Sequence, residues 1–92
     1  MPIVRATQTR PNIDVQFYQY SSEYVATLSA RHNFYSHMTM TQDGLTKIVE
    51  MTFDTTEDFD AWNNDLERKA MSGLVNEYNL QYGITTTYSL IP

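Results

Sequence analysis

The sequence predicts an α+β domain in which two helices pack on one face of a four-stranded antiparallel sheet. Three features support this fold class: stretches that alternate apolar and polar residues, an Asp-Gly turn between two of them, and a long stretch with apolar residues every three or four positions. The 92 residues, 41% of them hydrophobic, suffice for one core. We therefore expect a single domain over residues 1–92, with an extended segment at 1–12 and the packed core at 13–90.

The composition excludes several kinds of site. The chain has no cysteine, which excludes a disulfide framework, a thiolate zinc site and a cysteine nucleophile, and favours a cytoplasmic protein, in the host cytoplasm if the source is a virus. Residues 1–5 lack the apolar run of a signal peptide, and no stretch approaches the roughly 20 apolar residues that cross a bilayer. Eleven acidic and six basic residues give a net charge of −5. We therefore expect neither a membrane nor a nucleic acid as partner.

The first strand of the sheet is predicted at residues 13–20, after the break at Pro11-Asn12. This stretch alternates apolar and polar side chains over most of its length, which is typical of a half-buried strand. The alternation would direct Ile13 and Phe17 into the core and leave Tyr18 and Tyr20 on the opposite face of the sheet. Residues 3–9 are expected to form only an extended lead before this strand.

A short helix and a hairpin follow. Ser21-Ser22 supplies hydroxyl groups for the N-terminus of a helix that ends near Asn33. Asp43-Gly44 predicts a type I′ turn, because aspartate and glycine tolerate a positive φ angle. Lys47 is then the main charged residue on the otherwise apolar face of the hairpin. The register pairs Met40 with Lys47, Met38 with Val49, and His37 with Glu50.

A second helix is predicted to begin among the capping side chains of residues 54–57 and to end at Gly83, before a last strand at 84–90. As one unbroken helix from 56 to 81 it would be about 39 Å long, which exceeds the length of so small a sheet. Ser72-Gly73 lies in its middle, so the helix kinks there, divides, or meets another backbone closely. The apolar residues at helical spacing are Phe59, Trp62, Leu66, Ala70, Leu74 and Tyr78.

The order of elements is βαββαβ, the ferredoxin-like plan, with an additional extended segment at the N-terminus. A hairpin strand at 49–53 that leads through an acidic start into an aromatic helix at 57–62 resembles the dimeric α+β barrel group, over residues 13–90. This group contains monooxygenases, isomerases, haem-degrading enzymes and non-catalytic members. The resemblance implies dimerisation through the sheets. Residues 2–11 also resemble the start of small uncharacterised phage proteins.

Few residues suggest chemistry. His32 and His37 are five residues apart without a third ligand at a metal spacing, so we expect no metal and no cofactor. His37 and Glu50 face each other in the predicted register, either as an acid–base pair or as an exposed cross-strand pair that contributes little. Haem-degrading members of the group use a helix tryptophan together with an asparagine and a histidine. Only the tryptophan, Trp62, is present in the matching position, which favours a role in the core.

The acidic stretch from Asp54 to Glu67 has two interpretations. It could bind a cation or mimic a nucleic acid, but most of these acids lie near a helix start, where negative charge is stabilising. Asp65 could also pair with Lys69 one helical turn away. We therefore interpret the stretch as structural.

Two functions follow from the sequence. The first is a non-catalytic interaction or structural protein that forms a homodimer or larger assembly, for example an accessory protein of a phage. Its interface would be an outer sheet face with few charges, or the second helix beyond Gly73. The alternative is a small cofactor-independent enzyme of the monooxygenase or isomerase type. An enclosed pocket with convergent polar groups would favour the enzyme. The predicted interface consists of Tyr18, Tyr20, Ile48, Thr85 and Thr87, and the predicted proton-transfer groups are His37, Glu50, Tyr18 and Tyr88.

Overall fold

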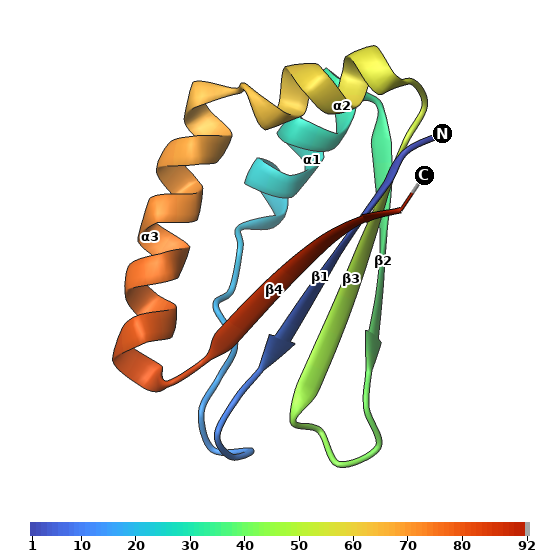
Figure 1. Cartoon of the computed structure of the whole chain (residues 1–92). Helices are drawn as coiled ribbons and strands as arrows, with labels where there is room; N and C mark the ends of the chain where they lie inside the picture. Colours follow the sequence, from blue (N-terminus) through green and yellow to red (C-terminus); the bar gives the residue numbers. More distant parts are fainter. Residues whose placement is uncertain (92) are drawn as a thin grey trace.

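Four antiparallel strands form one sheet, and three helices cover one of its faces, in the computed structural model, which describes residues 1–91 (Figure 1). The strand order is β2-β3-β1-β4, so β1 and β3 are central. This confirms the ferredoxin-like βαββαβ plan, with three helices where the sequence predicted two. The elements are β1 (Ile3–Thr9), α1 (Ser22–His32), β2 (Phe34–Met40), β3 (Thr46–Phe53), α2 (Thr56–Asn63), α3 (Leu66–Tyr82) and β4 (Thr85–Ile91).

The predicted first strand is wrong, and so is the division of the chain at residue 12. Residues 3–9 form β1, which pairs with β3 on one side and β4 on the other. Residues 13–20 instead connect β1 to α1 along the helix side of the sheet (Figure 1). α1 is short and does not extend along the whole inner face of the sheet. Residues 13–20 run along part of the face that α1 does not cover. Phe17 is buried as predicted, whereas Ile13 is 65% exposed.

The hairpin has the predicted register but a different turn. Met40 pairs with Lys47, Met38 with Val49 and His37 with Glu50. Gly44 has a φ angle of 74°, whereas Asp43 does not have a positive φ angle. A type I′ turn needs positive φ at both central residues. The loop is instead closed by Thr41, whose carbonyl accepts from the amide of Gly44 and whose amide donates to the carbonyl of Thr46 (both 2.9 Å).

The helix ends are capped where the sequence indicates, but the long helix divides earlier than expected. Ser21 Oγ accepts from the amide of Tyr24, and Gly83 ends α3 in the left-handed conformation. The break falls between Asn63 and Leu66, where Asp65 caps α3, and not at Ser72-Gly73. α2 lies over the end of the sheet, and the chain turns a corner between α2 and α3 (Figure 1).

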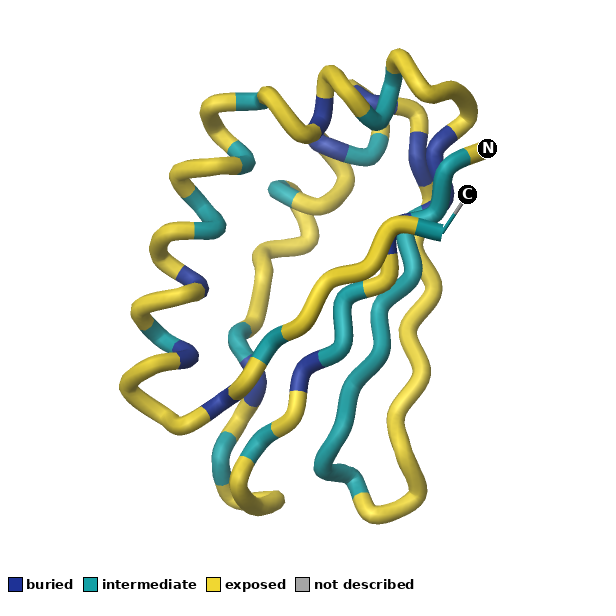
Figure 2. Tube along the Cα trace, in the orientation of Figure 1, coloured by how far each residue is buried: buried dark blue, intermediate teal, exposed yellow. Residues whose placement is uncertain are grey.

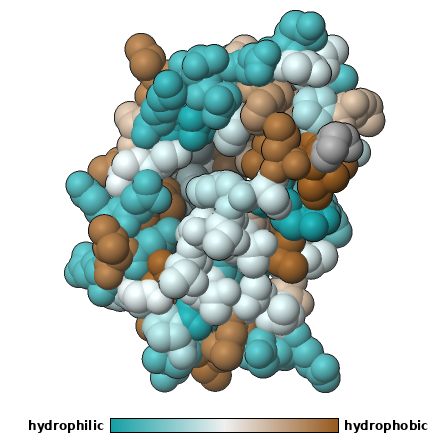
Figure 3. Space-filling model, viewed as in Figure 1, coloured by the Kyte–Doolittle hydropathy of each residue, from teal (hydrophilic) through white to brown (hydrophobic). Residues whose placement is uncertain are grey.

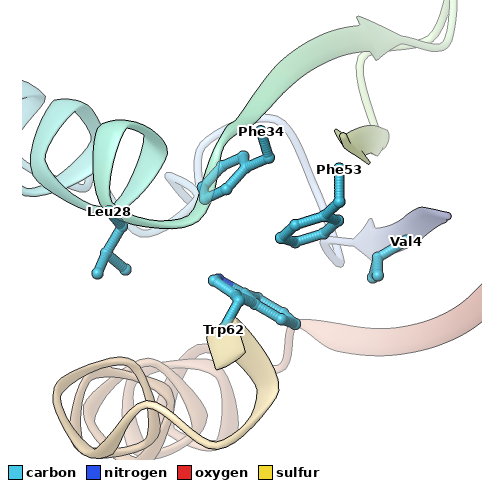
Figure 4. Close-up of a cluster of buried hydrophobic side chains, with 5 residues drawn as sticks. All are labelled: Val4, Leu28, Phe34, Phe53 and Trp62. Carbon is cyan, nitrogen blue, oxygen red and sulfur yellow. The ribbon is translucent and has the colours of Figure 1, made fainter. Parts of the chain in front are cut away.

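The core lies at the end of the sheet where α1 and α2 cross it. Phe53 is fully buried, and its ring lies 5.0 Å from that of Phe34 and 5.4 Å from that of Trp62, between centroids (Figure 4). Burying such a ring stabilises the fold by roughly 1.5–3 kcal/mol. Trp62 therefore belongs to the core, as predicted, but Leu66, its expected neighbour, is 80% exposed. The buried cluster consists of Val4, Leu28, Phe34, Phe53 and Trp62.

Burial is uneven outside this cluster. The dark segments of Figure 2 lie mostly at the end of the sheet where α1 and α2 cross it, with others on the side of α3 that faces the sheet, whereas β2, an edge strand, is exposed over most of its length. Met38 and Met40 lie on the helix side of β2, yet they are 58% and 45% exposed. The helices therefore leave part of the inner sheet face uncovered.

Candidate functional site

A pocket of about 280 Å³ lies between the inner face of the sheet, α1 and α3. Its floor contains Ala6, Val49 and Met51 of the central strands, which share one face because side chains alternate along a strand. α1 contributes Val25 and Leu28. The pocket is small and mostly apolar, as a site for a small organic molecule usually is.

The pocket remains open because the residues around it do not fill the space between α3 and the sheet. α3 contributes Arg68 and Ser72 to the wall, and β1 contributes the short side chain of Ala6 to the floor. Toward its C-terminus the helix is bonded to the sheet, where Asn79 Nδ2 donates to Thr86 Oγ1 (3.1 Å). The opening thus lies beside the N-terminal half of α3.

Arg68 is held rigidly at the edge of the pocket. Its Nε donates to the carbonyl of Trp62 (3.2 Å), its Nη1 to Ser72 Oγ (3.2 Å) and its Nη2 to the carbonyl of Asn63 (2.8 Å). The guanidinium also lies 4.5 Å from the centroid of the Trp62 ring. Each Nη retains a second N–H group that these bonds do not use. Arg68 can therefore donate to a ligand without leaving its place.

Lys47 lies on the floor of the pocket, in the central strand β3. Its ammonium is 4.9 Å from the centroid of the Phe17 ring, and burial lowers the pKa of its side chain. Gln8, opposite Lys47 in the register, is 9% exposed and lines the same pocket. Among residues 1–91, no carboxylate forms an ion pair with Lys47 or with Arg68.

Three tyrosines complete the polar lining. Tyr20 stacks on Tyr24 with the ring centroids 5.8 Å apart, and Tyr88 enters from β4. Burial, together with a smaller contribution from Tyr88, raises the pKa of the Tyr20 phenol to about 12, whereas Arg68 opposes the shift. Tyr20 is therefore a neutral hydrogen-bond donor at physiological pH.

A second cavity, of about 380 Å³, adjoins the first on the side of β4. The surface over β4 in Figure 3 is pale, of intermediate hydropathy, while apolar side chains gather near the chain termini. The residues that line both cavities are Trp62, Arg68, Ser72 and Tyr88. Arg68 therefore lies where the two cavities meet.

The predicted proton-transfer groups do not come together. His37 and Glu50 are opposite each other, but on the outer face of the sheet, away from the pocket. Glu50 Oε2 there accepts two hydrogen bonds from Arg5, from Nε (3.0 Å) and Nη2 (2.8 Å). Tyr18 lies on the helix side, where its hydroxyl donates to Met71 Sδ (3.6 Å). Of these four predicted proton-transfer groups, Tyr88 alone lines the pocket.

The predicted interface residues are also divided. Tyr18 and Tyr20 do not share the outer sheet face, because residues 13–20 are not a strand of the sheet. Tyr20 is instead a wall of the pocket. Ile48 lies on the outer face, in a row with Thr7 and Thr87, and Thr85 lies farther along the same face. The interface itself remains a prediction for these last residues.

Lys47 and Arg68 are the functional candidates that sequence reasoning missed. Lys47 did carry a signal, since it is the charged misfit on an apolar strand face. Arg68 carried none, because the phase of α3 depends on where the long helix breaks. Within residues 1–91, no three His, Asp or Glu side chains are grouped closely enough to hold a metal ion. No helix in this part of the chain is long and apolar enough to cross a membrane.

Comparison with known proteins supports the fold and no more. No protein-family model matches the sequence, and no curated protein matches it. Among solved structures, the fold is similar to that of an assumed antibiotic biosynthesis monooxygenase from Deinococcus radiodurans, with a TM-score of 0.53 and 10% identity over 100% of this chain and 91% of that one. The likeness supports the predicted resemblance to the dimeric α+β barrel group at the level of the fold. Nothing in these comparisons supports the likeness of residues 2–11 to phage proteins.

Proposed function

We propose that this chain is a small enzyme of the dimeric α+β barrel type, which binds and converts a small, largely apolar molecule between its helices and its sheet. The observation that carries the proposal is the pocket of about 280 Å³ with apolar walls and convergent polar groups. A purely structural protein has no need of such a pocket, and a filled core would be more stable. The pocket thus favours the enzymatic alternative over the interaction protein that the sequence suggested first.

The lining suits reactions of the monooxygenase or isomerase type that begin with loss of a substrate proton. Because no carboxylate or imidazole of residues 1–91 lines the pocket, the proton passes to a solvent base. The step leaves a negative charge on the substrate, and fixed donors aimed at that charge lower the barrier. Lys47, Arg68 and the phenol of Tyr88 are donors placed around the pocket. The activity assigned to the protein from Deinococcus radiodurans makes oxygenation the first such reaction to test.

A filled pocket tests this proposal. We expect 2-tetralone, a neutral two-ring ketone, to quench the fluorescence of Trp62 saturably, because Trp62 lines the pocket and is the single tryptophan. Ala6→Leu places a larger side chain on the floor and should weaken binding at least about tenfold, by steric exclusion. Thr7→Leu adds a leucine one residue along the same strand, on the outer face, and serves as the matched control.

Turnover is tested with the same molecule. We expect the protein to accelerate exchange of the α-protons of 2-tetralone in D₂O, followed by NMR, because deprotonation at that carbon is the step shared by the proposed reactions. Ala6→Leu should lose this acceleration and Thr7→Leu should keep it. Saturable binding without exchange above the solvent rate would mean a binding protein and not an enzyme. Equal binding by both variants would mean that the pocket is not the site.

A further inference from the structure

The two cations of the pocket are unusual for this chain. Eleven acidic residues outnumber six basic ones, yet the pocket is lined by Lys47 and Arg68, the adjoining cavity by Arg68, and neither lining contains a carboxylate of residues 1–91. The acidic residues of the helix starts, such as Glu57 and Asp58 of α2, line neither cavity. The charged side chains that line the pocket are therefore opposite in sign to the net charge of the protein.

Burying a cation without a counter-ion costs desolvation free energy, which neighbouring groups or a bound ligand must offset. Lys47 loses solvation on the floor of the pocket, which is why its pKa falls. The Phe17 ring beneath its ammonium offers partial compensation but carries no charge. Arg68 is compensated by carbonyl groups and Ser72, again without a carboxylate. Lys47 and Arg68 thus both line the pocket without a carboxylate to balance their positive charge.

On these grounds we propose that the ligand of the pocket is an organic anion: an aromatic or alicyclic body that carries one carboxylate, enolate or phenolate group. The acidic group binds between Lys47 and Arg68, where Gln8 and the neutral phenol of Tyr20 can also donate. The apolar body lies on Val49 and the other floor residues. This inference rests on the proposed function, since it names the substrate class of the same pocket.

A matched pair of probes separates charge from shape. 2-Naphthoate and 2-naphthamide have nearly the same size, and only the first is an anion. We expect the wild-type protein to bind 2-naphthoate about tenfold more tightly than 2-naphthamide, by Trp62 fluorescence and calorimetry, because hydrogen bonds to a charged partner are the stronger ones. Equal affinity for the two probes would overturn the inference and leave the proposed function standing. If neither probe nor 2-tetralone binds, the proposed function itself fails.

Variants of Lys47 locate the charge. Lys47→Met keeps an unbranched side chain as far as the ε position and removes the ammonium, so it should weaken 2-naphthoate binding about tenfold and change 2-naphthamide binding less than about twofold. Lys47→Arg retains the charge and should restore most of the affinity if the methionine variant is well folded. Lys69→Met, an exposed position on α3, is the control and should bind both probes as the wild type does. A loss of equal size for both probes in Lys47→Met would contradict the assignment.

Discussion

The side chain of Asp65 holds together the junction between α2 and α3 and links it to α1. Its Oδ1 accepts the amides of Glu67 (2.9 Å) and Arg68 (3.2 Å), which caps α3. Its Oδ2 bonds to His32 Nε2 (2.7 Å) and accepts from Arg31 Nη1 (2.9 Å), which joins α1 to the same point. The ion pair with Lys69 that its spacing suggested is not formed. Asp65 thus positions Arg68, and with it one edge of the pocket.

The charge of Asp65 predicts a pH-dependent loss of stability. Its bonds to His32, Arg31 and the backbone hold the pKa of the carboxyl well below its usual value. A lowered pKa means that the carboxylate stabilises the fold above the unfolded-state pKa of about 4 and does so less as the pH falls below it. Asp65→Asn keeps an oxygen for the cap and loses the charge. The difference in unfolding free energy between wild type and Asp65→Asn should therefore shrink between about pH 5 and about pH 2.

Urea unfolding at several pH values measures this difference. Asp60→Asn, at an exposed position on α2, changes an aspartate that forms no ion pair among residues 1–91, and its difference from wild type should vary little with pH. A gap for Asp65→Asn that is as large at about pH 2 as at about pH 6 would show that its charge does not matter.

At the scale of elements, the position of one helix break decides what α3 presents to the sheet. Val75 and Asn79 are buried and Arg68, Met71, Ser72 and Tyr78 are partly buried, while Leu66, Leu74 and Leu80 face outward. The apolar stripe read from the sequence assumed continuity with α2. Because Asn64 and Asp65 interrupt the helix, the phase of α3 is reset, and polar side chains face the pocket. Apolar residues remain scattered over the α3 side of the surface (Figure 3).

Two glycines, one within α3 and one that caps its C-terminus, should respond oppositely to substitution by alanine. Gly73 lies within the helix and a Cβ there would meet nothing within 4 Å, so Gly73→Ala should raise the free energy of unfolding by about 0.5–1 kcal/mol. Gly83 ends the helix with a φ angle of 73°, so Gly83→Ala should lower it by about 1 kcal/mol. Urea unfolding followed by circular dichroism measures both. Destabilisation by Gly73→Ala would mean that another backbone approaches this face of α3.

At the scale of the whole molecule, the outer face of the sheet is the surface on which we propose that a second copy binds. All three helices lie on the other face (Figure 1). The outer face carries a row of Thr39, Ile48, Thr7 and Thr87 across the four strands, with Arg5 and Glu50 paired beside it. A face with few unpaired charges resembles a partner-facing surface more than a solvent-facing one.

A charge at the centre of this face tests the proposal. Ile48→Glu should convert a dimer at micromolar concentration into a folded monomer, because a carboxylate buried at an interface without a partner is costly. Light scattering after size exclusion gives the mass, and circular dichroism shows whether the fold is kept. Leu74→Glu, at a 55% exposed position on α3, is the matched control and should leave the dimer intact. A monomeric wild type, or dissociation by Leu74→Glu alone, would exclude the sheet face.

The sequence determined those features that depend on neighbouring residues. The register of the β2–β3 hairpin follows from alternation on both sides of a loop, so that His37 and Glu50 could be placed opposite each other. Ser21 and Gly83 mark helix ends because caps are local hydrogen-bond and φ requirements. The order of elements, and from it the fold, is the sum of such local signals.

Only the tertiary structure decided which of two extended segments enters the sheet. Residues 3–9 and 13–20 both have strand character, and the choice depends on pairing with β3 and β4, which are distant in sequence. The pocket was hidden for the same reason: Ala6, Lys47 and Arg68 come from three elements and meet only after α3 has turned at Asp65. The one sign of this site in the sequence was Lys47, a charged residue on an otherwise apolar strand face. Its meaning appears only when the folded chain supplies a cavity around it, because burial gives an unpaired charge its energetic weight.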